Sequence, residues 1–256
     1  MCTLGLILGQ SSRFPAIVAA NRDEAEDRPS RAPHLWSERS PLVVAGSDER
    51  AGGTWLGVNE NGLVVGLTNL WQGQPADPAL ASRGDIVLAL LGTASLEQAS
   101  RLLTRQDPLA TNAFLCVVLD AAGRAFYAHS EDALEQHRID AGIHAFGNRP
   151  PVERPAKLGA AQQRMQEAWS NRGGDGGGEI LEALRPPLAH HTGDRGPRES
   201  VCVHGRQGFG TVSSTLLLLG VNGERSRLYH VEGPPCQAAF TDLSSELDSL
   251  FSATMS

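Results

Sequence analysis

The sequence predicts an α+β protein built from antiparallel sheets covered by layers of helices. Strand candidates occur in blocks of hairpins, and pairs of helix candidates separate these blocks. A parallel sheet would instead alternate single strands with single helices. The 256 residues contain no low-complexity linker, so we expect a single domain over residues 1–256. Hydrophobic residues make up 41% of the chain, which suffices for a substantial core.

The chain opens with a predicted β-hairpin, in which a polar turn joins two apolar runs at residues 3–8 and 15–20. A turn centred between Ser11 and Ser12 places Leu8 opposite Pro15. The same register carries Cys2 opposite Asn21.

A second hairpin is predicted over residues 54–59 and 63–69, because Asn61-Gly62 between them is the strongest two-residue hairpin signal. Ala51-Gly52-Gly53 precedes it, and glycines permit close approach of two backbones.

The remaining elements follow from apolar periodicity and from turn residues. Helices are expected at residues 82–91, 95–103, 157–169 and 179–188, with a short helix at the end of the chain. Ser95 and Gln98 have the spacing of a capping box. Strands are expected at residues 114–119, 125–129, 144–147, 200–204, 213–221 and 227–232, with Asn222-Gly223 as a hairpin turn.

Composition argues against several classes of partner. The net charge is −7 and no basic run occurs, so neither nucleic acid nor an anionic membrane surface is expected as a partner. The chain has no apolar run of membrane-spanning length and no signal peptide. We therefore expect a cytoplasmic protein, with its oligomeric state left open.

Neither a metal nor a cofactor is predicted. The four cysteines lack the close spacing of a zinc knuckle or a redox motif, and Cys116 and Cys202 are expected to be inert thiols in buried strands. Adjacent histidines such as His190-His191 point apart in most backbones, so a solvated loop is expected there. No complete dinucleotide fingerprint is present.

Cys2 differs from the other cysteines because of its place in the chain. Removal of Met1 would leave a cysteine whose α-amine has a pKa near ~8 and can serve as general base for its own thiol. The thiolate that attacks a substrate needs nearby positive charge or hydrogen-bond donors. The alternative is a cysteine that stands at this position by chance.

Polar residues at predicted strand ends supply the partners that such a nucleophile needs. In Asn21-Arg22-Asp23-Glu24, Arg22 would favour the thiolate and Asp23 would hold the α-ammonium group. Asn69 and Asn148 could donate to an oxyanion, an interaction worth up to ~3–4 kcal/mol of barrier. The alternative for each asparagine is ordinary turn chemistry.

These segments together resemble the NRDE family, whose animal members are called transport and Golgi organisation protein 2. The motifs that carry the resemblance are Met1-Cys2, Asn21-Arg22-Asp23-Glu24 with Arg28-Pro29, Gly52-Gly53-Thr54-Trp55-Leu56-Gly57, Leu67-Thr68-Asn69, Phe146-Gly147-Asn148 and Gly210-Thr211 with Ser213-Ser214-Thr215. The family is similar to the N-terminal-nucleophile (Ntn) hydrolases, among them the bile-salt hydrolases and penicillin V acylases. The resemblance implies a four-layer αββα sandwich of antiparallel sheets.

The resemblance also implies roles for single residues. Cys2 would be both nucleophile and base, Asp23 would lie near the amine, and Asn69 and Asn148 would match the two asparagines of the acylases. The sequence departs from the acylase pattern at Ala20, where they have an arginine. It also has Val212 where the NRDE family usually has an arginine. A site that lacks a cation forms thiolate less readily.

Two functions from different classes follow. The first is a cysteine Ntn hydrolase that cleaves an amide C–N bond, or a related acyl bond, in a small molecule. The second is a carrier with weak or no catalysis, because animal relatives are associated with haem or lipid handling; no haem-attachment motif supports it. A structural scaffold is a third option. Trp55 and Trp71 would line a ligand pocket or pack in the core.

Overall fold

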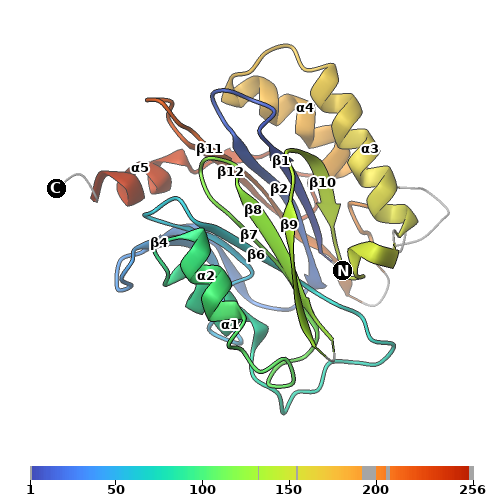
Figure 1. Ribbon diagram of the computed structural model, residues 1–256. Coiled ribbons are helices and arrows are strands. Elements are labelled where there is room, and N and C mark those ends of the chain that lie inside the picture. The colour runs from blue at the N-terminus through green and yellow to red at the C-terminus, as the bar shows by residue number, and fades with distance from the viewer. Residues whose placement is uncertain (1, 132, 154, 192–199, 206–207, 254–256) are drawn as a thin grey trace.

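The computed structural model describes residues 2–131, 133–153, 155–191, 200–205 and 208–253. In this part of the chain two antiparallel sheets pack face to face. One has six strands in the order β10-β1-β2-β11-β12-β13, and the other has seven strands, β3 to β9, in sequence order. Helices α3 and α4 cover the first sheet, and α1 and α2 cover the second (Figure 1). The predicted four-layer αββα sandwich is confirmed.

The bounds of the elements are as follows. The six-stranded sheet contains β1 (Thr3–Leu8), β2 (Ala16–Ala25), β10 (Gly142–Phe146), β11 (Phe209–Leu219), β12 (Arg227–Glu232) and β13 (Thr241–Asp242). The seven-stranded sheet contains β3 (Ser30–Trp36), β4 (Val43–Asp48), β5 (Leu56–Asn59), β6 (Val64–Asn69), β7 (Phe114–Leu119), β8 (Ala125–Ser130) and β9 (Leu134–Ile139). The helices are α1 (Arg83–Leu91), α2 (Leu96–Leu103), α3 (Ala156–Ser170), α4 (Gly177–Ala189) and α5 (Ser244–Ser252).

The core has three apolar layers, because each sheet buries both of its faces. Along β1, Leu4, Leu6 and Leu8 lie between the two sheets, whereas Ile7 faces α3 and α4. The alternation follows from the two-residue period of a strand. It makes the even-numbered residues of β1 face the space between the sheets, a direction that matters for Cys2. Helix α5 adds Leu247 and Leu250 to the same layer.

The register predicted for the first hairpin is wrong by one residue. Leu8 pairs with Ala16 rather than with Pro15, and Thr3 pairs with Asn21. The loop is longer than a tight turn and is centred on Ser12. Gly9, at φ +64°, donates its N–H to the carbonyl of Pro15, and the hydroxyl of Ser11 accepts from two N–H groups inside the loop. The shift brings Arg22, rather than Asn21, level with Cys2.

The second hairpin is confirmed. Gly62, at φ +74°, closes the turn by donating to the carbonyl of Asn59. The side chain of Asn59 accepts from two N–H groups of the same turn. The helix predictions also agree with the structure, because α1 to α4 lie within two residues of their predicted bounds. Ser95 caps α2 as predicted, and Ser82 caps α1.

One predicted strand is wrong. Residues 200–204 form no strand apart from an isolated bridge between His204 and Gly210. The N–H groups of Val201 and Cys202 donate to the carbonyl of His190, and the N–H of Val203 donates to the Thr211 hydroxyl. Cys202 is buried as expected, but it lies in this loop. Within the described residues, no helix is both long enough and apolar enough to cross a bilayer.

Candidate active site

Cys2 lies at the start of β1, at one end of the space between the two sheets. Its Sγ is 3.9 Å from the carbonyl oxygen of Asp23. The residue is half-buried and lines a pocket of about 450 Å³, together with Arg22, Asn69 and Arg83. The residue therefore lies at the wall of a cavity rather than within the apolar core. Met1, and with it the expected processing of the N-terminus, lies outside the described residues.

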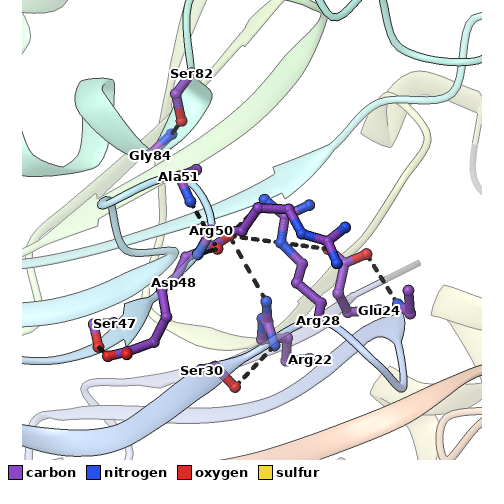
Figure 2. A network of polar contacts seen from close by, with 12 residues as sticks. Arg22, Glu24, Arg28, Ser30, Ser47, Asp48, Arg50, Ala51, Ser82 and Gly84 are labelled. Atoms are coloured by element: carbon purple, nitrogen blue, oxygen red, sulfur yellow. Dashed lines mark hydrogen bonds and ion pairs between the residues drawn. The ribbon is translucent and has the colours of Figure 1, made fainter.

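Arg22 faces the same pocket from β2. It stands two residues after Ala20, which lies in the layer between the sheets, so it projects from the same face of the strand. Its Nη2 is 3.9 Å from Oδ2 of Asp48, and its Nη1 donates to the hydroxyl of Ser30 over 3.4 Å (Figure 2). A cation therefore occupies this face even though Ala20 replaces the arginine of the acylases.

Asp48 is the centre of a polar network at the rim of the pocket (Figure 2). Arg28 donates to its Oδ2 from Nε at 2.8 Å and pairs with it from Nη2 at 2.6 Å. The N–H groups of Arg50 and Ala51 donate to Oδ1. Partial burial is the largest single effect and opposes the charge of Asp48. The hydrogen bond and charge of Arg28, together with the N–H groups of Ala51 and Arg50, outweigh burial and lower the pKa of this carboxyl. The network fixes the loop that leads to the second hairpin.

Asp23 is a buried carboxylate with partners from two other elements. The hydroxyl of Thr211 on β11 donates to its Oδ1 over 2.6 Å, and Nζ of Lys157 on α3 lies 3.7 Å from its Oδ2. Burial raises the pKa of Asp23, and the charge of Lys157 opposes the rise. Lys157 is a candidate site residue that the sequence analysis did not identify.

Asn21 does not line the pocket of Cys2. Its side chain is fully buried on the opposite face of β2 and donates to the carbonyls of Leu188 and Val201. The amide joins β2 to the end of α4 and to the loop before β11. This position suits a residue that holds the neighbouring Arg22 and Asp23 in place.

Asn69 and Asn148 lie near each other at the ends of two strands. Asn69 ends β6 and lines the pocket of Cys2, and both asparagines line an adjoining pocket of about 720 Å³. Two hydrogen bonds hold the strand ends together. The Thr68 hydroxyl donates to the carbonyl of Gly147 over 2.7 Å, and the N–H of Trp71 donates to the carbonyl of Asn148 over 3.0 Å.

Arg83 is a second cation that the sequence analysis missed. It begins α1, lines both pockets, and donates from Nη1 to the carbonyl of Ala113. Burial lowers the pKa of Arg83, and its interaction with an ionised Cys2 opposes that effect. Val212, where the resemblance led us to expect an arginine, lies at a β-bulge between Thr211 and Ser213. Arg83 thus provides positive charge near the sulfur from a different element.

The pKa of the Cys2 thiol is raised, chiefly by burial; the Asp23 charge adds to the rise and Arg22 opposes it. Burial also raises the pKa of Cys116, which lies in β7 as expected, and raises that of Cys202 to about 12. Of these three cysteines, Cys2 lines the pocket with the two arginines.

Solved structures share this architecture. The chain superposes on a variant of conjugated bile acid hydrolase from Clostridium perfringens with a TM-score of 0.59 and 12% identity, covering 96% of this chain and 93% of that one. Penicillin V acylase from Agrobacterium tumefaciens gives 0.58 and 16%, with coverages of 90% and 83%. An N-acylethanolamine-hydrolyzing acid amidase ortholog from Caenorhabditis elegans gives 0.57 and 11%, with coverages of 87% and 95%. The protein has the Ntn-hydrolase fold.

Sequence comparison defines the family more closely. Residues 1–229 match the family described as Transport and Golgi organisation 2, and the chain belongs to that family. It is 38% identical over 91 residues to the Transport and Golgi organization 2 homolog of Mus musculus, and 39% identical over 82 residues to the human homolog. These alignments span 35% and 31% of this chain, and 32% and 29% of the relatives. The chain therefore matches about a third of the length of these curated relatives.

Proposed function

We propose that this protein is an N-terminal-cysteine hydrolase that cleaves an amide C–N bond, or a related acyl bond, in a small molecule. The observation that carries the proposal is the position of Cys2, which lines a pocket together with Asn69 and four arginines, among them Arg22 and Arg83. A thiolate is favoured by nearby cations, and a side-chain amide is a suitable donor to an oxyanion.

The reaction would proceed in two halves. After removal of Met1, the α-amine of Cys2 takes the proton of the thiol, and Sγ bonds to the carbonyl carbon of the substrate. Asn69 and Asn148 donate to the oxyanion that forms. Collapse of this intermediate breaks the C–N bond, and the amine leaves with the proton. Water then attacks the thioester, releases the acid and restores Cys2.

Asp23 would act on the amine rather than on the substrate. The carboxylate, with Lys157 and the Thr211 hydroxyl beside it, is suited to hold the α-ammonium group while the thiolate attacks. This arrangement parallels the way a third group orients the base of other nucleophiles. Asn21 contributes by fixing β2.

The test is a substrate screen on protein whose native N-terminus has been verified by intact mass. N-acyl amides and thioesters of graded chain length are incubated with wild type, Cys2→Ala and Cys2→Ser, and release of amine or thiol is followed. We expect turnover by wild type that both variants lose. Retention of Met1 on the folded protein, or release that is equal in Cys2→Ala, would overturn the proposal.

The same variants address the haem or lipid carrier alternative. A carrier would bind its ligand at equal strength in wild type and in Cys2→Ala, and wild type would leave the ligand chemically unchanged. A hydrolase would convert the bound molecule only when Cys2 is present.

A further inference from the structure

Two cysteines and two histidines gather on the six-stranded sheet side of the molecule, outside the pocket of Cys2. His191 follows α4, Cys202 and His204 lie in the loop before β11, and Cys236 follows β12. We call these four residues the Cys/His cluster. They come from three segments of the chain, so their proximity is produced by the fold.

Several donor atoms of the cluster lie close enough to one another to bind a common metal ion. The two sulfurs lie 3.6 Å apart, and Nε2 of His204 is 3.7 Å from Sγ of Cys202 and 3.0 Å from Sγ of Cys236. The donor atoms of His191, His204 and Cys236 lie within 4.8 Å of one another. A tetrahedral site with Zn–S bonds of about 2.3 Å and Zn–N bonds of about 2.1 Å separates its ligands by about 3.5–3.8 Å.

The rings of the two histidines also lie close to each other. The rings of His191 and His204 meet edge to face, with centroids 5.1 Å apart. Both histidines and Cys236 are exposed, whereas Cys202 is buried and fixes the inner side of the cluster. A tetrahedral set of two thiolates and two imidazoles is the donor set of structural zinc sites.

We propose that the Cys/His cluster is a structural zinc site. Zinc forms two bonds to sulfur and two to imidazole nitrogen, and the two thiol protons pass to solvent. The charge of the ion is then balanced by the two thiolates. The proposal departs from the expectation that the chain holds no metal, which was drawn from the spacing of the cysteines and from His190-His191.

The zinc site would support the candidate active site through a short chain of hydrogen bonds. Between Cys202 and His204, the N–H of Val203 donates to the Thr211 hydroxyl over 2.8 Å, and that hydroxyl donates to Asp23 over 2.6 Å. One residue before Cys202, the carbonyl of Val201 accepts from Asn21. The metal would thus fix the loop that holds two residues of the Asn21–Glu24 segment.

The test measures metal content rather than turnover, so it does not depend on the proposed hydrolase activity. Protein reduced with a phosphine is loaded with zinc chloride and desalted. Its zinc content is then measured by inductively coupled plasma mass spectrometry. We expect about one equivalent of zinc per chain in wild type and in Cys2→Ala. We expect at least a tenfold loss in Cys236→Ser and in His204→Ala. His144→Gln, a histidine outside the cluster, is the control and should keep the metal.

Cobalt(II) in place of zinc provides a second readout. A tetrahedral site with thiolate ligands gives intense visible ligand-field bands and sulfur-to-cobalt charge-transfer bands, and Cys236→Ser should weaken both. Two results would overturn the proposal. The first is absence of zinc from reduced, folded wild type, and the second is zinc content unchanged in a folded Cys236→Ser/His204→Ala double variant. A wild type that remains a Cys202–Cys236 disulfide after reduction, seen by intact mass, would also overturn it.

Discussion

Nζ of Lys157 lies 3.7 Å from Oδ2 of Asp23, and the two side chains are only 7% and 0% exposed. Lys157 is in the first turn of α3, where the helix dipole disfavours a cation. Its position there is explained by the carboxylate on β2. The pair therefore ties the helix layer to the strand that carries the Asn21–Glu24 segment.

Replacing Lys157 by methionine should destabilise the fold. The variant keeps most of the aliphatic volume but removes the charge beside a buried carboxylate. Loss of one partner of a buried ion pair usually lowers the free energy of unfolding by about 3–5 kcal/mol. Urea denaturation of wild type and Lys157→Met, followed by circular dichroism, measures the loss. Lys157→Arg, which keeps the charge, should lose less.

A double-mutant cycle tests whether the loss comes from the pair itself. Asp23→Asn removes the charge that Lys157 faces, so the second substitution should then have a much smaller effect. We expect a coupling of about 1–3 kcal/mol between the two sites. Simple additivity of the two losses would contradict the interaction described here.

Arg83 should control how easily Cys2 ionises. Burial raises the pKa of the Cys2 thiol, and nearby positive charge opposes the rise, so removal of a cation should raise that pKa further. In Arg83→Gln, alkylation of Cys2 by iodoacetamide at pH 7 should be about threefold to tenfold slower, since one pKa unit changes the thiolate fraction about tenfold. Peptide mass spectrometry over a pH series gives the alkylation rate of Cys2 at each pH, and the inflexion of that rate with pH gives the pKa of the thiol.

Arg101→Gln is the matched control for this measurement. Arg101 is an exposed arginine in the last turn of α2, and it does not line the pocket of Cys2. Its loss should leave the alkylation profile of Cys2 unchanged. Equal slowing in the two variants would mean that general charge, rather than the position of Arg83, sets the thiol pKa.

The sequence was sufficient to predict most helices and strands of this fold, because the signals that mark them are local. The Ser95 cap, an Asn-Gly turn and apolar runs predicted α1, α2, β5 to β7 and β12 close to their observed bounds. The strands that it did not predict include β3 and β9, the two edges of the seven-stranded sheet. Edge strands bury little apolar surface, and in β9 only Ile139 is buried, so no run of hydrophobic residues marks them.

The site was predictable only where its residues lie in sequence motifs. Asn69 and Arg22 were placed at the pocket with Cys2, but the hairpin register was one residue off, because a loop of several residues does not reveal its centre. Lys157 and Arg83 come from helices far along the chain. Both are cations in the first turn of a helix, where the dipole disfavours them, and this mismatch is a signal that could have identified them.

Asp48 should make the stability of the protein depend on pH in the acidic range. Its folded pKa is lowered, because Arg28 and the N–H groups of Ala51 and Arg50 together outweigh the opposing effect of burial. The carboxylate therefore contributes stability that is fully present above an ordinary aspartate pKa of about 3.9, and this stability is lost as the pH falls through the folded pKa. Wild type should exceed Asp48→Asn by about 1–2 kcal/mol at pH 6, and the difference should shrink toward pH 3.

Asp120→Asn is the control for Asp48, since Asp120 pairs at similar distances, 2.6 Å and 2.7 Å, with Arg124, whose side chain is 63% exposed against 25% for Arg28. An exposed pair contributes about 0–1 kcal/mol, so this variant should differ little from wild type throughout. Urea midpoints measured at several pH values give the stability of both variants relative to wild type. A difference between wild type and Asp48→Asn that stays constant with pH would contradict the assigned role of the carboxylate.

Gly53 should be intolerant of any side chain, because it lies directly against the start of α1. A Cβ at this position would come within 2.9 Å of the Cα of Gly84, the residue after Arg83. Backbone on both sides has little room to move, so Gly53→Ala should lower the free energy of unfolding by about 1–3 kcal/mol. It should also slow alkylation of Cys2 by displacing Arg83.

Gly159→Ala is the control, because Gly159 faces open space on α3. This substitution should stabilise the protein by about 0.5–1 kcal/mol. Calorimetry and the alkylation assay on both variants decide the matter, and a Gly53→Ala protein of normal stability and reactivity would refute the contact.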